Sequence, residues 1–247
     1  MRNRLRTYAA AFALALAPLA LTTAADAQAP AAPPAPSGPA PASGQPQLTS
    51  MPAEKTAQII GKVQDFYDKT TNFQADFSQE YLVKQYNKKK TSHGHVVFDK
   101  PGKMSWTYLD PAGNRVVSDG KKLKVFEADS KQLYEQDVNA SQYPAALAFL
   151  TGQGKLADVF EFTAFEGAQM SFPGGVVLIG VPKTATPAYQ KVLFYVDGAT
   201  SQIRRVLIID GQGNHNRFDF VQPLVNQKLP PGQFAFTPPP GTTTIHP

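Results

Sequence analysis

The chain of 247 residues contains no cysteine, which excludes disulfide bonds, thiol catalysis and cysteine ligands to a metal. A lipid-modified N-terminal cysteine of the kind that anchors bacterial lipoproteins is excluded as well. Phosphate-binding loops are also absent, because Gly113 and Gly120 have the wrong spacing and the segment 211–216 lacks a third glycine. No G-x-S-x-G nucleophile elbow occurs, although a Ser-His-Asp site could be assembled from distant residues. These absences favour a binding protein over an enzyme.

Apolar runs long enough to span a membrane are lacking too. The stretch 8–21 is shorter than the roughly 20 residues that a spanning helix needs, and Pro18 interrupts it. It follows a start containing three arginines and precedes Ala25-Asp26-Ala27, a small-x-small cleavage site. We therefore predict that residues 1–27 are a secretory signal peptide and that the mature protein is exported.

Charge is sparse in the next segment, a Pro/Ala-rich leader over residues 28–52 that cannot pack a core. Residues 53–247 show no repeat of fixed period and are treated as one domain. Removal of residues 1–27 leaves 21 basic and 18 acidic residues, a net charge of +3. Export and scattered lysines argue against nucleic acid as a partner, and a mildly basic rim suits acidic headgroups or an acidic protein.

The domain is rich in strand patterns and poor in helix patterns. One amphipathic helix is predicted over 53–69, with Thr49 or Ser50 as its cap, and a second over 141–154. Asp-Gly pairs at 119–120, 197–198 and 210–211 each separate two apolar runs and predict antiparallel hairpins. The segment 84–90 is predicted as a polar hairpin loop. Further strands are predicted over 73–82, 93–100, 103–110, 131–138, 159–167, 175–183, 189–198, 202–210, 215–222 and 233–238.

Aromatic residues alternate along several of these strands. Phe77 lies on one predicted strand, and Met104, Trp106 and Tyr108 share a face of another. A sheet with so few helices must form a sandwich, close into a barrel, or curl around its helices. In the last case an incompletely filled apolar concavity is a candidate ligand site, although core packing explains the same pattern.

The pair His93 and His95 could place two imidazoles on one face of a strand as metal ligands. Gly94, Val96 and Phe98 lie on the opposite face, so both histidines are expected to point to solvent. No third ligand is evident, and we expect no metal and no cofactor.

Several segments together resemble the family of periplasmic outer-membrane lipoprotein carriers, the LolA family. They are FQADFSQ at 73–79, KPGKMSWTYLDPAGNRVVSDGKKLKVFEADSKQLYEQDV at 100–138, LAFLTGQGKL at 147–156, IDGQGNHNRFDF at 209–220 and FAFTPPPGTTTI at 234–245. The resemblance implies a mainly β fold with α, an unclosed antiparallel β-barrel (half-barrel) whose apolar concave face is covered by an α-helical lid. Its implied function is that of a soluble periplasmic chaperone without enzymatic activity.

Such a carrier accepts lipoproteins released by an inner-membrane ABC transporter, shields their acyl chains and delivers them to the outer membrane, where a receptor lipoprotein is a further partner. The implied state is a monomer. The implied acyl-chain cavity comprises Phe77, Met104, Trp106, Tyr108, Leu147, Phe149 and Leu150.

The resemblance also implies a lid latch at position 100, where the family usually has an arginine that bonds to lid backbone. Here the residue is Lys100, which lacks the planar fork of donors. Two other functions stay open: another periplasmic lipid-binding or lipoprotein-sensing module of this fold, and a hydrolase on a β scaffold. A receptor lipoprotein of the same fold is disfavoured because the chain has no cysteine.

Overall fold

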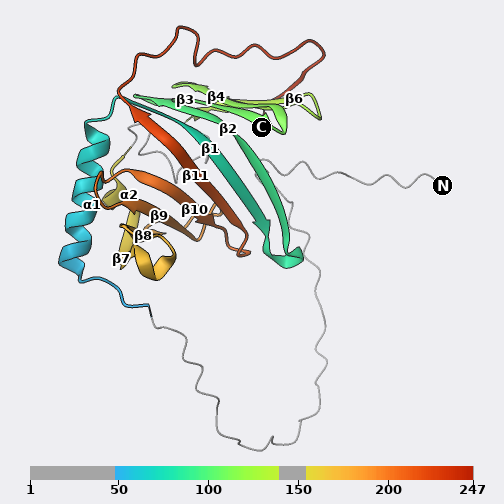
Figure 1. Ribbon diagram of the computed structural model, residues 1–247. Helices are drawn as coiled ribbons and strands as arrows, with labels where there is room; N and C mark the ends of the chain where they lie inside the picture. Colours follow the sequence, from blue (N-terminus) through green and yellow to red (C-terminus); the bar gives the residue numbers. More distant parts are fainter. Residues whose placement is uncertain (1–47, 139–153, 247) are drawn as a thin grey trace, which may run out of the picture. The chain divides into compact units, whose positions relative to one another are not determined.

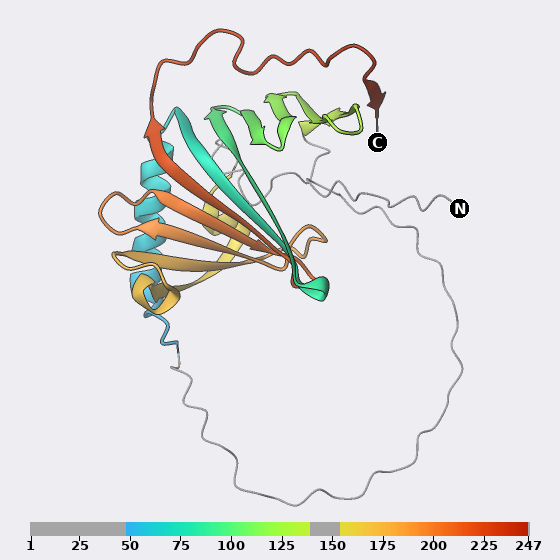
Figure 2. The same ribbon diagram turned by 45° about the vertical axis from the view of Figure 1, so that its right-hand side comes forward.

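The computed structural model describes residues 48–138 and 154–246 (Figures 1 and 2). Residues from Thr49 onward belong to one compact unit. The helices are α1 (Ala53–Asp68), α2 (Leu156–Val159) and the 3-10 turns η1 (Lys84–Tyr86) and η4 (Gly167–Met170). The strands are β1 (Asn72–Val83), β2 (Lys88–Asp99), β3 (Lys103–Asp110), β4 (Ala112–Asp119), β5 (Lys122–Glu127), β6 (Gln132–Asp137), β7 (Phe160–Glu166), β8 (Gly175–Pro182), β9 (Lys191–Asp197), β10 (Ile203–Ile209), β11 (His215–Val225) and β12 (Thr243–Ile245).

These strands form a single sheet in the order β12-β6-β5-β4-β3-β2-β1-β11-β10-β9-β8-β7. All neighbours are antiparallel except β12, which pairs in parallel with β6. Within the described ranges no ladder joins β7 to β12, so the sheet is not closed. The predicted mainly β, unclosed antiparallel architecture is confirmed. In the part of the chain that the structure covers, no helix combines the length and apolarity needed to cross a bilayer.

The three Asp-Gly pairs lie at the turns of the β4-β5, β9-β10 and β10-β11 hairpins, as predicted. In each turn the aspartate accepts backbone N–H groups from residues further along the chain. Asp119 accepts from Lys121 and Lys122, and these bonds hold the pKa of its carboxyl below the ordinary value. Asp197 accepts from Ala199 and Thr200 with the same effect on its pKa. All three turns thus depend on side-chain capping by aspartate, and the β4-β5 turn depends also on Gly120, which has a φ of 94°.

The register of the sheet separates two faces, which we define by their residues. The inner face carries Trp106, which lies opposite Val96 on β2 and Val116 on β4. The same face continues on the other half of the sheet, where Phe194 lies opposite Leu178 and Val206. The outer face carries His95 and the residues that alternate with the inner set. Period-two alternation in the sequence therefore places most large aromatic side chains of the strands on the inner face, with Phe126, Phe165 and Tyr195 on the outer face.

The segment 84–90 differs from the predicted hairpin loop. Lys84–Tyr86 form η1, Asn87 takes a left-handed conformation with φ 47°, and β2 begins at Lys88. Lys88, Lys89 and Lys90 pair with Val83, Leu82 and Tyr81 on β1. Polar composition suggested a loop, but an asparagine that tolerates the left-handed conformation makes the turn much tighter.

The predicted strand at 233–238 is wrong. This segment consists of a turn followed by residues without regular secondary structure, and it places two aromatic rings on the outer face. The Phe236 ring lies 5.4 Å from that of Phe126, and the guanidinium of Arg115 lies 5.6 Å from the Phe236 ring. Lys103 Nζ lies 5.7 Å from the Phe234 ring. The alternating phenylalanines of this segment therefore pack on side chains of β3, β4 and β5, and the segment does not pair with a strand.

Helix α1 confirms the first predicted helix but not its cap. Pro52 occupies the N-cap position and makes no side-chain capping bond. Thr49 and Ser50 instead contact the β7 region, since Ser50 bridges Phe165 and the Thr49 N–H donates to Gln169. Pro52 has an extended conformation, and its carbonyl accepts the backbone N–H of Thr56 at 3.0 Å in the first turn of the helix. The second predicted helix, at 141–154, lies almost entirely outside the described residues.

Candidate functional site

Four of the predicted cavity residues lie together on the inner face. Phe77, Met104, Trp106 and Tyr108 are all at most 4% exposed. The Phe77 ring is 4.9 Å from that of Trp106 and 5.1 Å from that of Tyr108, both in edge-on geometry. Such edge-to-face pairs stabilise a cluster beyond its buried area. The remaining predicted cavity residues, Leu147, Phe149 and Leu150, lie outside the described residues.

The aromatic cluster is larger than the predicted set. Trp106 also lies 5.2 Å from Phe218 and 5.8 Å from Phe98, measured between ring centroids. Phe220 packs on Phe73 at 5.4 Å and reaches Trp106 at 6.5 Å. Phe218 and Phe220 come from β11, which is far along the chain but lies next to β1. The alternation in RFDFV at 217–221 was the signal for them, but only the strand order shows that they meet Trp106.

A short chain of polar groups borders this cluster. The Tyr108 hydroxyl donates to Gln79 Oε1 at 3.1 Å, and Gln79 Nε2 donates to Asn216 Oδ1 at 2.8 Å. Burial raises the pKa of the Tyr108 hydroxyl, so it stays a neutral donor. These polar groups are buried but hydrogen-bonded, as stability requires. The site is therefore a broad apolar surface, bordered on one side by polar groups that are hydrogen-bonded to one another.

Lys100 follows β2 and reaches back to the end of α1. Its Nζ donates to the backbone carbonyl of Tyr67, in the last turn of the helix, and its own N–H donates to the Thr71 carbonyl at 3.0 Å. Burial lowers the pKa of the Lys100 ammonium, an effect that nearby Asp68 opposes. A cation at a helix C-terminus satisfies an orphan carbonyl and complements the helix dipole. Lys100 is thus placed where it can hold α1.

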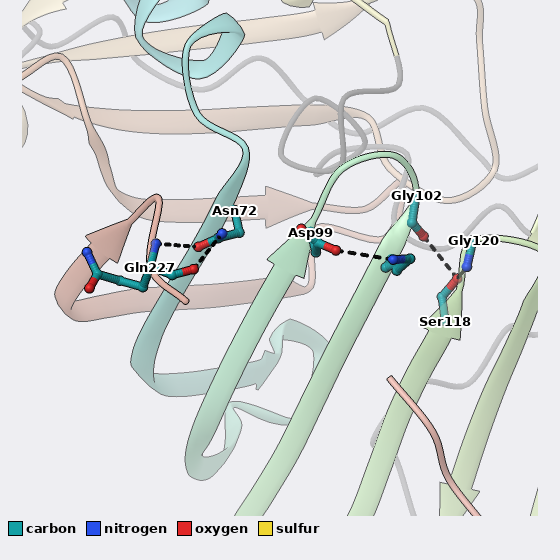
Figure 3. Close-up of polar contacts among 7 residues, drawn as sticks. Asn72, Asp99, Gly102, Ser118, Gly120 and Gln227 are labelled. Atoms are coloured by element: carbon teal, nitrogen blue, oxygen red, sulfur yellow. Dashed lines mark hydrogen bonds and ion pairs between the residues drawn. The ribbon is translucent and has the colours of Figure 1, made fainter. Parts of the chain in front are cut away.

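The turn that carries Lys100 is held at its base by polar contacts (Figure 3). The Ser118 hydroxyl donates to the Gly102 carbonyl and accepts from the Gly120 N–H, both at 3.0 Å. At the start of β1, Asn72 Nδ2 donates to the backbone carbonyl of Gln227, and Asn72 Oδ1 accepts the backbone N–H of Gln227, both at 2.9 Å. The first pair of bonds joins the end of β4 to the β2-β3 turn, which contains position 100. The second pair joins the start of β1 to the chain after β11.

Tyr67 connects α1 to the other half of the sheet. It is 1% exposed, and its hydroxyl accepts the backbone N–H of Ile203 at 3.1 Å. Burial raises the pKa of this hydroxyl, so it remains protonated. The C-terminal turn of α1 therefore has one contact to β10 through Tyr67 and another to the β2-β3 turn through Lys100.

The two histidines of the H-x-H pair are exposed on the outer face. His95 Nδ1 is paired with the Asp76 carboxylate, and His93 lies opposite Ser78. Over residues 48–138 and 154–246, no group of three or more potential ligands is positioned to hold a metal ion.

An unclosed antiparallel sheet, with an aromatic inner face and a helix fastened to it, defines the chain as a half-barrel protein. The model of the family described as outer membrane lipoprotein carrier protein LolA matches residues 68–237, more than half of the chain. The chain belongs to this family.

Curated relatives of this chain include several outer-membrane lipoprotein carrier proteins. An outer-membrane lipoprotein carrier protein of Nitrosospira multiformis is 28% identical over 189 residues, which cover 75% of this chain and 87% of the relative. One of Alkalilimnicola ehrlichii is 29% identical over 182 residues, covering 73% and 80%. Among solved structures, a LolA superfamily protein from Nitrosomonas europaea aligns with 73% of this chain and 97% of its own, at 12% identity and a TM-score of 0.43.

Proposed function

We propose that this protein is a periplasmic carrier that binds the acyl chains of lipoproteins and delivers them to the outer membrane. The observation that supports this most is the inner aromatic cluster around Trp106, in a chain of the LolA family. Each methylene removed from water contributes about 0.8 kcal/mol, so an acyl chain does not leave a membrane without an apolar surface to receive it. A sheet face dense in aromatic rings offers such a surface.

In this proposal the acyl-chain site comprises Phe77, Met104, Trp106 and Tyr108 together with Leu147, Phe149 and Leu150. The first four are fully buried, so acyl chains must displace whatever covers them. Lys100 acts as the latch through its bond to the Tyr67 carbonyl, which favours the unloaded arrangement. Because binding must be reversible, this competition keeps the affinity for acyl chains moderate.

The partners follow from the same role. An inner-membrane ABC transporter supplies the lipoprotein, the protein crosses the periplasm as a monomer, and an outer-membrane receptor lipoprotein accepts the cargo. The signal peptide at 1–27 directs export, and the Pro/Ala-rich leader at 28–52 precedes the carrier domain. The transfer makes and breaks no covalent bond, so the role requires neither a metal nor a cofactor.

The direct test is depletion of the protein in cells, followed by separation of inner and outer membranes. The proposal predicts that outer-membrane lipoproteins accumulate in the inner membrane, while outer-membrane proteins without acyl chains are sorted normally. Normal lipoprotein sorting after depletion would contradict it. A complementary test purifies the protein from the periplasm and identifies acylated proteins bound to it, since a lipid-binding module of another kind would carry free lipid alone.

A further inference from the structure

The indole nitrogen of Trp106 has no hydrogen-bond partner, although the side chain is fully buried. Trp106 is 0% exposed, and among the described residues its Nε1 is one of three buried side-chain nitrogens without an acceptor. It is the only tryptophan in the chain. Buried indole N–H groups usually find an acceptor, so this one needs an explanation.

The other two nitrogens differ from it. Arg115 Nε belongs to a guanidinium whose Nη2 donates to Ser105 Oγ at 3.1 Å. Arg217 Nε lies 2.9 Å from Asp219 Oδ2, in an ion pair whose angle is not that of a hydrogen bond. Both groups therefore have polar neighbours, and both lie on the outer face. Of these three residues, Trp106 alone lies on the inner face and has a donor with no polar neighbour.

The surroundings of Trp106 supply no substitute for an acceptor. Its ring neighbours are Phe77, Phe98, Phe218 and Phe220. An aromatic face accepts an N–H only weakly. The polar groups that border the cluster bond to one another, since Tyr108 donates to Gln79 and Gln79 donates to Asn216, and none of them accepts from the Trp106 indole. A phenylalanine would fill an apolar position of this kind without leaving a buried donor unpaired.

We propose that Trp106 Nε1 donates a hydrogen bond to the carbonyl oxygen of an acyl group in the bound lipid. This rests on the proposed function and adds to it, because it assigns a polar recognition element to an otherwise apolar site. A fatty acyl chain bound through an ester or amide carries one strong acceptor at the head of an apolar tail. Trp106 offers the matching arrangement, one donor surrounded by apolar rings, and so distinguishes acyl lipids from ligands with hydrocarbon alone.

The experiment uses the single tryptophan as its own reporter. In the ¹⁵N-labelled protein the indole N–H gives one NMR cross-peak, whose proton moves downfield when it donates to a carbonyl. The probes are a diacylated lipopeptide with a free N-terminus and its analogue with ether-linked chains, which lacks the acyl carbonyls. The ester probe should shift the cross-peak downfield and bind about fivefold to tenfold more tightly than the ether probe, since one hydrogen bond distinguishes them.

A second pair, an ester-linked and an ether-linked phosphatidylethanolamine, distinguishes lipoprotein from free phospholipid as the source of the acyl group. A matched protein replaces tryptophan with benzothienylalanine, a ring of similar shape without the N–H, which alters one position because the chain has one tryptophan. This variant should bind the ester and ether lipopeptides equally, with the affinity of the natural protein for the ether probe.

The outcomes separate the two proposals. Equal binding of ester and ether probes with no downfield shift would overturn the role of Trp106, while binding of either lipopeptide would leave the carrier function intact. Failure to bind any acylated probe would instead contradict the proposed function. A preference for the ester probe that persists after the benzothienylalanine replacement would assign this preference to another residue, and would also overturn the proposal.

Discussion

Lys100 places a single cation at the end of α1, beside the mainly apolar inner face. Its Nζ donates to the Tyr67 carbonyl in the last turn of α1, and its backbone N–H donates to the Thr71 carbonyl in the link between α1 and β1. A lysine provides one point charge with rotatable donors, whereas an arginine presents a planar fork. The latch proposed here therefore depends on one carbonyl at the helix terminus and not on several.

Replacement of Lys100 with leucine should weaken the attachment of α1 without unfolding the protein. The loss of one hydrogen bond from a charged donor to a backbone carbonyl is expected to cost about 1.5 to 3 kcal/mol of local stability. Amide hydrogen exchange at Lys69 and Thr70, whose N–H groups bond to the last turn of α1, should become faster. Lipoprotein release should become slower, because the unloaded state is less favoured.

The matched control is Lys121→Leu, which removes an exposed lysine from the β4-β5 turn. It should change neither exchange in α1 nor release. If Lys100→Leu also leaves both unchanged, the residue has no latch function and contributes only surface charge.

At the scale of elements, two glycines show how the same substitution has opposite effects in a strand and in a helix. A Cβ at Gly94, on β2, would lie 1.9 Å from the Thr107 carbonyl oxygen of β3. A Cβ at Gly61, on α1, would have no heavy atom within 4 Å. The strand glycine allows close approach of two backbones beside Phe77, while the helix glycine only reduces helix propensity.

Gly94→Ala should lower the free energy of unfolding by about 3 kcal/mol, because the backbone of β2 or β3 must shift. Gly61→Ala should raise it by roughly 0.5 to 1 kcal/mol, as expected for an exposed helical position. Urea denaturation of the two variants measures both values. A neutral Gly94→Ala would show that β2 and β3 are further apart than described.

The chain after β11 is a second element with a definite structural role. Phe236 packs against Phe126 and under Arg115, so Phe236→Ala should destabilise the protein by about 1 to 2 kcal/mol. Tyr86→Ala, which truncates an aromatic side chain that is 65% exposed, is the control and should be close to neutral. Equal effects of the two substitutions in thermal unfolding would mean that the C-terminal segment does not cover the outer face.

The elements that sequence alone could predict are those with local signals. Asp-Gly turns between apolar runs gave the hairpins, and the alternation around Trp106 gave the inner face of β3. The 233–238 segment has the same alternation, yet its rings pack across the outer face, and composition alone does not distinguish the two outcomes. Asn87 likewise tightened a turn that lysine-rich composition had suggested was a long loop.

Over the whole molecule, the site depends on contacts between distant segments. Trp106 meets Phe218 only because β11 pairs with β1, and Lys100 meets Tyr67 only because the β2-β3 turn lies beside the end of α1. Pairings of this kind are set by the order of strands in the sheet, which local periodicity does not encode. The residues on β1 and β3 were therefore predictable, whereas Phe218, Phe220 and the partners of Lys100 were not.

The two faces of the sheet have different roles. On the outer face, apolar positions are covered by the protein's own side chains, such as Met170 and Phe172 over Val177 and Tyr195. The inner face carries the aromatic cluster around Trp106 and contacts α1 through Tyr67 and Ile203. We propose that acyl chains bind to this inner face.

Site-specific photo-crosslinking in cells tests that claim most directly. A small diazirine amino acid is placed at Met104, on the inner face, or at Thr107, which faces outward between His95 and Arg115. If acyl chains bind to the inner face, the probe at Met104 crosslinks to acylated lipoproteins and the probe at Thr107 does not. Crosslinking that is equal at both positions, or confined to Thr107, would contradict binding of acyl chains to the inner face.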